Sequence, residues 1–184
     1  MQKALSITEG AFYLFIENIR IMATIPEPLN FASAIAFTQE LLAQSKISAS
    51  EVAQLVQTEE GARGFFVTYL TSDFAVSEEI IVGLRSQIEI VSELLVKNLA
   101  MSTAQELFHH RRQDEEMAKS SQQVQERTAR LIKLVNLDLV SEKLQQLVAT
   151  IETGGNYQAF LERWNYDEEQ KQAIKAAINK LLGK

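Results

Sequence analysis

Apolar residues in the central part of the chain recur every three or four positions, which is the spacing of one face of an α-helix. The residues that repeat in this way are Ile80, Ile81, Leu84, Ile88, Val91, Leu95 and Leu99. Neither glycine nor proline occurs from Leu84 to Thr153, so nothing in the backbone chemistry requires a turn there. We therefore expect one long central helix, from Ser77 to about Val135, on which the other helices pack.

Four shorter helices are expected before the central one, because each begins with a capping signal. Ser6–Glu9 and Ser48–Glu51 are capping boxes, in which a serine or threonine and a later glutamate satisfy free backbone N–H groups. The predicted helices cover residues 7–23, residues 31–44 after Asn30, a short segment after Ser48, and the segment from Thr58 to Leu70. Pro26 and Pro28 end the first of them, because proline cannot donate a backbone hydrogen bond.

Small residues in the fourth predicted helix favour a close contact with another helix. Gly61 and Gly64 each weaken a helix by about 1 kcal/mol relative to alanine, so we look for a packing reason for their presence. Together with Ala62 they form a face without bulky side chains. We expect a neighbouring helix to approach this face.

The aromatic residues are concentrated in the first part of the chain, and most of them lie at or before Phe74. Large rings fill irregular globular cores, whereas aliphatic stripes suit seams between helices. We therefore expect residues 1–108 to form a compact bundle that includes the first half of the central helix. Residues 109–184 are expected to form an extended, coiled-coil-like helix and C-terminal helices, within one continuous structural unit.

Beyond His109 the central helix carries one thin line of residues at a spacing close to 3.5, which is typical of a coiled-coil seam. Its members are Met117, Ser121, Val124, Thr128, Leu131 and Val135. If the helix is continuous, this stripe projects from the bundle, and an exposed apolar stripe favours a second copy across a two-fold axis. We therefore predict a homodimer, with the four apolar members of the stripe as interaction residues.

A second apolar stripe does not continue the first, so we expect a kink or turn at Asn136–Asp138, with Asp138 as an N-cap. Its members are Leu137, Val140, Leu144, Leu147, Val148 and Ile151. Gly154 suits the left-handed end of a helix, and Asn156 and Asp167 are predicted to cap two last helices. The first of these carries Phe160, Leu161 and Trp164, and the second carries Ile174, Ala177, Ile178 and Leu181.

The charged segment from His109 to Glu116 has three interpretations. A basic helix end followed by an acidic helix start predicts a break, since each charge suits the dipole of its own helix. Arg111 with Glu115 and Arg112 with Glu116 are instead spaced for a continuous helix, each pair contributing about 0.3 kcal/mol. Arg111 and Arg112 are also a candidate docking patch for an acidic partner. We expect the continuous helix and keep the other two interpretations as alternatives.

The two histidines of the chain, His109 and His110, are the candidates for an imidazole metal site. Glu106 precedes His109 by three residues, the spacing found in carboxylate-bridged di-iron bundles, but a second such pair needs a third histidine. Glu106 with His110, or His110 with Asp114, has the i,i+4 spacing for a single metal ion. We expect both rings to be solvated and no metal to be bound.

The composition excludes several classes of chemistry. Without cysteine the chain has no disulfide, no thiolate metal site and no cysteine nucleophile. A net charge of −6 without a concentrated basic face argues against nucleic-acid binding. No Ser, His and Asp arrangement and no phosphate-binding glycine loop nominates a reaction, so we expect no cofactor and no catalytic residue. No segment approaches the roughly 18 apolar residues that span a bilayer, and we expect a cytoplasmic location.

The apolar face of the first predicted helix has two interpretations. Its members are Phe12, Phe15, Ile16, Ile19 and Met22. Membrane-surface helices usually carry several Lys or Arg on their polar side, and here only Arg20 is basic. We therefore expect core packing, with a membrane surface as the alternative. Met22 would itself make an ordinary protein start, so residues 1–21 could also be an added leader.

These features together predict an all-α protein, a helical bundle built around one long central helix, with a helical C-terminal tail. The function we expect is a non-catalytic interaction protein, an adaptor or assembly factor that binds protein partners through helix surfaces and self-associates. The first alternative is a bundle that binds a small apolar ligand or a single metal near Glu106–His110. The second is a membrane-surface protein that binds through its N-terminal amphipathic helix.

Overall fold

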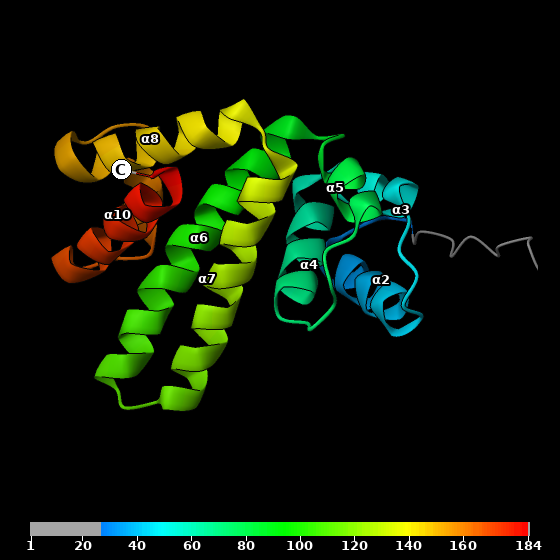
Figure 1. Ribbon diagram of the computed structural model, residues 1–184, viewed down its shortest axis with the longest axis horizontal. Coiled ribbons are helices and arrows are strands. Elements are labelled where there is room, and N and C mark those ends of the chain that lie inside the picture. Colours follow the sequence, from blue (N-terminus) through cyan, green and yellow to red (C-terminus); the bar gives the residue numbers. More distant parts are fainter. Residues whose placement is uncertain (1–26, 184) are drawn as a thin grey trace, which may run out of the picture.

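The computed structural model describes residues 27–183, and the secondary structure within them is entirely helical, which confirms the predicted fold class. The helices are α2 (Phe31–Ala43), α3 (Ala49–Leu55), α4 (Glu59–Leu70), α5 (Glu78–Leu84), α6 (Ile88–Arg111), α7 (Glu115–Val135), α8 (Asp138–Thr153), α9 (Gln158–Arg163) and α10 (Glu168–Leu182). The long central helix is α6, and α4, α7, α8 and α10 pack against it (Figure 1). The predicted helix over residues 7–23 and the leader hypothesis lie outside the described residues.

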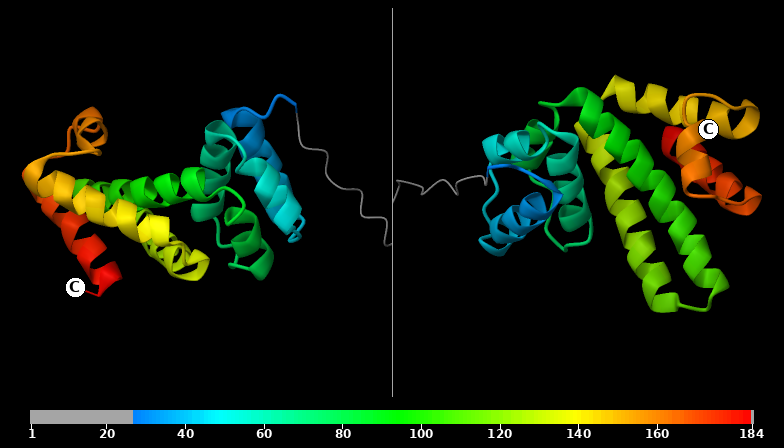
Figure 2. Two further views of the ribbon diagram at one scale, coloured as in Figure 1. Left: turned by 90° about the horizontal axis from the view of Figure 1, so that it is seen from above. Right: turned by 180° about the vertical axis from the view of Figure 1, so that it is seen from behind.

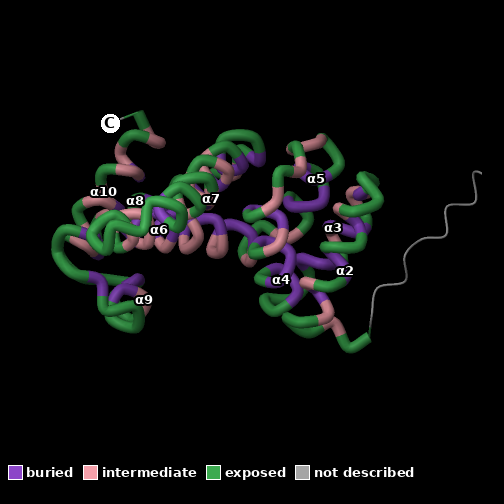
Figure 3. The backbone as a smooth tube through the Cα atoms, turned by 90° about the horizontal axis from the view of Figure 1, so that it is seen from below, coloured by how far each residue is buried: buried purple, intermediate pink, exposed green. Residues whose placement is uncertain are grey.

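A hairpin of α6 and α7 forms the middle of the molecule and separates two groups of shorter helices. The helices α2, α3, α4 and α5 lie on one side of it, and α8, α9 and α10 lie on the other (Figures 1 and 2). Buried residues gather where these elements meet, whereas residues 111–117 at the closed end of the hairpin are all exposed (Figure 3). The predicted domain boundary at residue 108 falls within α6 and stays a prediction.

Four capping side chains start helices at the places that the sequence predicts. Asn30, Ser48, Thr58 and Asp167 each accept a hydrogen bond from the backbone N–H three residues later, at the starts of α2, α3, α4 and α10. Such bonds satisfy donors that have no partner within the helix itself. The short helices are therefore determined largely by local sequence.

The predicted turn between α7 and α8 is confirmed, but its cap is a different residue. Asn136 ends α7 with a φ of 46°, in the left-handed region that asparagine tolerates. Leu137, not Asp138, holds the N-cap position of α8, and Tyr157, not Asn156, holds that of α9. Neither of these two caps makes a side-chain hydrogen bond to its helix.

Gly64 brings α4 into direct contact with α2, as the small residues predict. A Cβ atom at Gly64 would lie 2.6 Å from the Cβ of Ala34 and 2.8 Å from the carbonyl oxygen of Phe31. Carbon atoms in van der Waals contact lie about 3.5–4.0 Å apart, so this approach requires a residue without a side chain.

The prediction of one continuous helix from Ser77 to Val135 is wrong, and the first break separates α5 from α6. Ser86 Oγ donates to the carbonyl oxygen of Gly83 at 2.7 Å, and Gln87 leaves helical geometry with a φ of −132°. A serine hydroxyl that bonds to a nearby carbonyl offers the backbone an alternative to the helix. Residues 85–87, where the helix breaks, include neither glycine nor proline, so the amino-acid sequence carries no strong turn signal at this position.

The second break lies between α6 and α7, and it confirms the interpretation of the charged segment as a helix end followed by a helix start. Gln113 has a φ of 60°, and Asp114 caps the first turn of α7. Arg111 does not pair with the acid four residues on but with Asp167 and Glu169 at the start of α10. A contact distant in sequence therefore replaces the local pair on which the continuous helix depended.

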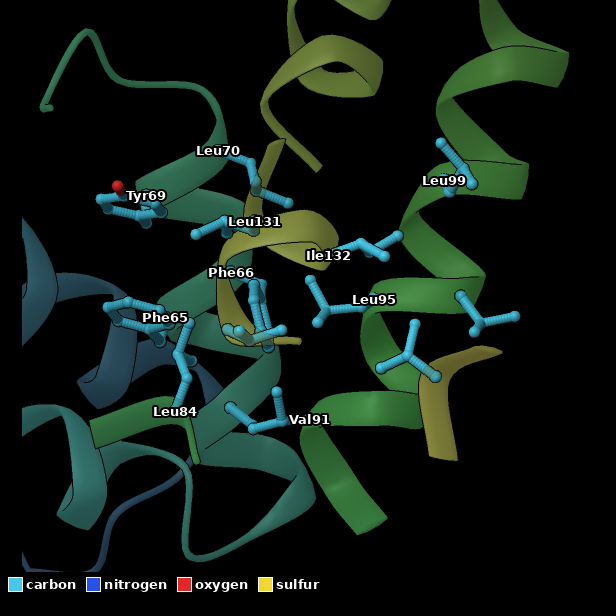
Figure 4. Packing of buried hydrophobic residues seen from close by; sticks show 14 of the residues in the cluster. Phe65, Phe66, Tyr69, Leu70, Leu84, Val91, Leu95, Leu99, Leu131 and Ile132 are labelled. Atoms are coloured by element: carbon cyan, nitrogen blue, oxygen red, sulfur yellow. The ribbon is translucent and has the colours of Figure 1, made fainter. Parts of the chain in front are cut away.

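Because α7 folds back onto α6, it buries part of the stripe that was expected to project. Leu131 and Val135 are fully buried, and Leu131 belongs to the same core as Leu70 of α4 and Leu95 of α6 (Figure 4). Val124 is half-buried against the same core, and Met117 is 46% exposed. The prediction of an exposed seam is therefore wrong for Leu131 and Val135, because the chain's own helices cover them.

Candidate functional site

A cleft of about 450 Å³ lies between the last turns of α6 and the connection from α9 into α10. α6 contributes Phe108 and Arg111 to its walls, its C-cap contributes Arg112, and the connection contributes Trp164, Asn165 and Tyr166. The two arginines are among the interaction residues predicted from sequence. The other four come together with them only through the fold.

The connection from α9 to α10 is fixed by its own backbone geometry. Trp164 is the C-cap of α9, and Asn165 turns the chain with a φ of 49° in the left-handed region. Asp167 then starts α10 as its N-cap. This turn leaves Trp164 at the surface, 43% exposed, whereas Tyr166 is 6% exposed.

Gln170 joins the start of α10 to α6. Its Oε1 accepts from the backbone N–H of Asp167 at 3.1 Å, and its Nε2 donates to the carbonyl oxygen of Ala104 at 3.1 Å. Gln170 is buried, and a buried donor without its partner costs about 1–3 kcal/mol, so this contact holds the cleft wall in place.

Arg111 closes one side of the cleft with charge-assisted hydrogen bonds. Its guanidinium donates to both carboxylate oxygens of Asp167 and to Glu169. The hydrogen bond from Arg111 lowers the pKa of the Asp167 carboxyl, and the backbone N–H of Gln170 lowers it further. The charge of Arg111 is therefore already matched within the chain.

Phe108, Arg112 and Trp164 form the exposed part of the cleft. The Arg112 Cζ lies 5.2 Å from the centroid of the Phe108 ring, in cation–π geometry. Phe108 is 38% exposed. In the described part of the chain, Arg112 has no acidic side chain within ion-pair distance. Two partly exposed aromatic side chains and one unmatched guanidinium thus line the same cleft.

Tyr166 forms the buried floor beside these side chains. Within residues 27–183 its hydroxyl has no hydrogen-bond partner, and burial raises the pKa of Tyr166 above its ordinary value. Its ring packs edge-on against Phe160 with the centroids 6.1 Å apart. Tyr166 and Asn165 also border a second hollow of about 240 Å³, whose other walls come from α8, α9 and α10.

The candidate metal ligands do not converge. No group of three or more His, Asp or Glu side chains that could hold a metal ion occurs among residues 27–183. His110 Nδ1 lies 3.1 Å from Glu115 Oε2, and Asp114 accepts from a backbone N–H of α7. His109 packs edge-on against Phe108, and Glu106 is half-buried beside them.

A second polar cluster joins α6, α8 and the start of α9 around Glu93. This carboxylate accepts from Lys97 at 2.8 Å, from Lys143 at 3.0 Å and from the Tyr157 hydroxyl at 3.0 Å. Desolvation raises the pKa of Glu93, but the three hydrogen bonds outweigh it and lower the pKa below its ordinary value. Burial and the Glu93 charge raise the pKa of Tyr157, so its hydroxyl stays a donor at neutral pH. The cluster is a structural tie between three helices.

Sequence reasoning missed Phe108, Trp164 and Gln170 as site residues. One signal was present, because Phe108 is isolated from other aromatic residues in a mostly polar segment. The contact of Gln170 with α6 had no signal, since it joins residues that are distant along the chain.

Comparison with known proteins places the chain in a family. The family model described as Uncharacterised conserved protein UCP020893 matches residues 30–181, from the start of α2 into α10, and the chain belongs to this family. No curated protein and no solved structure matches the chain. The matched residues include the whole cleft.

Proposed function

We propose that this member of the family is a non-catalytic interaction protein, an adaptor or assembly factor, that binds a protein partner at the cleft beside α6. The observation that carries the proposal is the exposure of Phe108 and Trp164 next to the unmatched charge of Arg112. Aromatic and arginine side chains supply much of the binding energy at protein interfaces. The hydrogen bonds of Arg111 and Gln170 hold the surrounding walls, which lowers the cost of ordering the site on binding.

A small-ligand site is a second candidate, and the position and size of the cleft support it. The cleft lies beside Glu106–His110, where the sequence suggests such a site, and 450 Å³ is within the range of about 300–1,000 Å³ typical of ligand pockets. Its walls include Arg111, Arg112 and Asp167, so a fully apolar ligand fits poorly. A ligand here would carry a carboxylate together with an aromatic or aliphatic part.

Self-association and a cytoplasmic location stay part of the proposal. A homodimer would now depend on exposed apolar side chains such as Met117 and Ile88, because Leu131 and Val135 belong to the core. Light scattering of the purified protein measures this directly. The N-terminal face suggested for membrane binding lies outside the described residues, and none of the helices within them is long and apolar enough to cross a bilayer.

Photo-crosslinking from the cleft tests the proposal. A benzophenone-bearing amino acid is placed at Trp164, or as a control at Val67, which is 46% exposed on α4, and both proteins are irradiated in extract of the source cells. We expect a discrete crosslinked protein from position 164 that is absent from position 67 and weakened by Arg112→Gln. No crosslink at position 164, or the same products at both positions, would contradict partner binding at the cleft.

A further inference from the structure

We propose that the cleft recognises one carboxylate next to a large apolar side chain, within an extended segment of a partner protein. The inference rests on the proposed function, because it specifies the chemistry of the partner at the same cleft. The supporting observation is that some side chains of the cleft already have hydrogen-bond or ion-pair partners within the chain, whereas others have none among the described residues.

The two arginines of the cleft differ in this respect. Arg111 already donates to Asp167 and Glu169, so an incoming anion would have to compete with two carboxylates of the chain. Arg112 stacks on Phe108 and has no carboxylate partner among the described residues. A guanidinium held on an aromatic face keeps an N–H edge free, and this edge matches a carboxylate with two parallel hydrogen bonds.

The apolar half of the proposed ligand follows from the two exposed rings. Phe108 is 38% exposed and Trp164 is 43% exposed, and both line the same cleft. Covering them with an aromatic or aliphatic side chain removes apolar surface from water on both partners. Because Arg112 lies on Phe108, the carboxylate and the apolar side chain must be close neighbours in the ligand.

Two free amides suit the backbone of an extended segment. Gln105 and Asn165 line the cleft, and their side-chain amides have no hydrogen-bond partner in the part of the chain that the structure describes. An extended peptide exposes backbone N–H and C=O groups, and an amide side chain can both donate to and accept from them. This arrangement favours a peptide over a ligand without amide groups.

The charge around the cleft limits the ligand to a low negative charge. Asp167 and Glu169 lie beside Arg111, and the whole chain carries a net charge of −6. A phosphorylated segment or a nucleic acid brings more negative charge than the single free guanidinium of Arg112 can balance. One carboxylate is the anion that this surface matches.

Trp164 is the chain's only tryptophan, so its fluorescence reports directly on the cleft. The full chain is titrated with the probe peptide acetyl-Ala-Phe-Glu-Ala-amide and with the same peptide carrying Gln in place of Glu. We expect a saturable change in emission with the Glu peptide and about tenfold weaker binding of the Gln peptide. Equal binding of the two peptides, or no change up to about 10 mM, would overturn carboxylate recognition.

Variants assign the preference to one side chain. Arg112→Gln should abolish the difference between the Glu and Gln peptides, whereas Lys133→Gln, which removes one exposed positive charge from α7, should leave it unchanged. Unchanged melting of Arg112→Gln shows that the fold is intact, since the Arg112 side chain lies at the surface. A preference that persists in Arg112→Gln would overturn the assignment.

Further probes separate the possible occupants of the cleft. If N-acetylphenylalanine binds as tightly as the tetrapeptide, the ligand is a small carboxylic acid and the partner segment is wrong. If light scattering shows a dimer that Arg112→Gln dissociates, the occupant is a second copy of this chain, and the proposal of a separate partner protein is wrong. If a partner crosslinks from position 164 but the Glu and Gln peptides bind equally well, carboxylate recognition is wrong and the proposed function stands.

Discussion

Arg85 binds the end of α7 through the backbone of Val135, with its Nε donating to the Val135 carbonyl oxygen at 2.9 Å. Its Nη2 also donates to the carbonyl oxygen of Leu134 at 3.1 Å. The last carbonyl groups of a helix have no partner within the helix, and a cationic donor complements the negative end of the helix dipole. The Arg85 side chain, at the junction of α5 and α6, therefore caps the last turn of α7 and holds the open end of the α6–α7 hairpin together.

Replacing Arg85 by glutamine should lower the free energy of unfolding by about 1–3 kcal/mol, because hydrogen bonds to charged groups contribute about this much. Urea unfolding followed by circular dichroism measures the change. Arg163→Gln is the matched control, because Arg163 is exposed and makes no ion pair among the described residues, and it should change stability by less than about 0.5 kcal/mol. Equal losses in the two variants would show that net charge, not capping, is responsible.

Gly64→Ala should destabilise the contact between α2 and α4, although alanine is the better helix former. The added Cβ would lie 2.8 Å from a backbone oxygen of α2, and backbone cannot rotate out of the way as a flexible side chain can. Overpacking of this kind costs about 1–3 kcal/mol, which should lower the thermal midpoint by roughly 2–4 °C per kcal/mol. A midpoint at or above that of the parent would show that α2 moves freely on α4. Ala36→Ser, on the exposed face of α2, is the control.

Leu95→Ala should lower the free energy of unfolding by about 2–5 kcal/mol, because Leu95 is fully buried in the middle of α6 and the substitution leaves a cavity. Ile88→Ala, at the start of the same helix, is the comparison. Ile88 is 48% exposed, so its truncation should cost far less. Chemical unfolding of both variants gives the two values, and similar losses would mean that burial does not distinguish these positions.

The parts of the fold that sequence predicted are those that local chemistry determines. Ser48 and Asp167 bond to backbone groups three residues away, so their caps can be read from neighbouring residues. The burial of Leu95 follows from helical periodicity in the same way. The central helix was predicted to be longer than it is because no comparable local signal marks the turn at Gln87.

The remaining features depend on contacts between distant segments. Arg111 is equally well placed for a local pair within a helix, and only the position of Asp167 decides that the chain turns after it. The candidate site depends on the same contact, together with the bond from Gln170 to Ala104. Sequence therefore predicted Arg111 and Arg112 as interaction residues without predicting the cleft that they line.

The Glu93 cluster should make stability depend on pH on the acid side. The pKa of Glu93 is lower in the folded protein than its ordinary value of 4.5, so the unfolded state binds the proton more readily. The stabilisation is therefore fully present above about pH 4.5 and is lost as the pH falls through the lower, folded-state pKa. Replacing Glu93 by glutamine should reduce the fall in stability below about pH 4.5.

Urea unfolding of the parent and of Glu93→Gln between about pH 3 and pH 7 measures this difference. At pH 7 the variant should be the less stable of the two, because Lys97 and Lys143 lose their charge-assisted hydrogen bonds to the Glu93 carboxylate. Glu142→Gln, an exposed acid on α8, serves as the control. Parallel pH profiles for the parent and Glu93→Gln would show that the hydrogen bonds to Glu93 contribute no net stability.

The last prediction separates the folded-back hairpin from a projecting helix by charging two positions of the same stripe. Leu131→Glu places a carboxylate among the buried side chains of α4 and α6, and an unpaired buried charge costs a large part of the typical stability of about 5–15 kcal/mol. Met117 is 46% exposed near the tip of the hairpin, so Met117→Glu should change stability by less than about 0.5 kcal/mol.

Circular dichroism measures whether each variant is folded, and light scattering measures its oligomeric state. A folded, monomeric Leu131→Glu protein derived from a dimeric parent would show that α7 projects and pairs with a second copy. Loss of folded protein in this variant alone would show that the stripe belongs to the chain's own core.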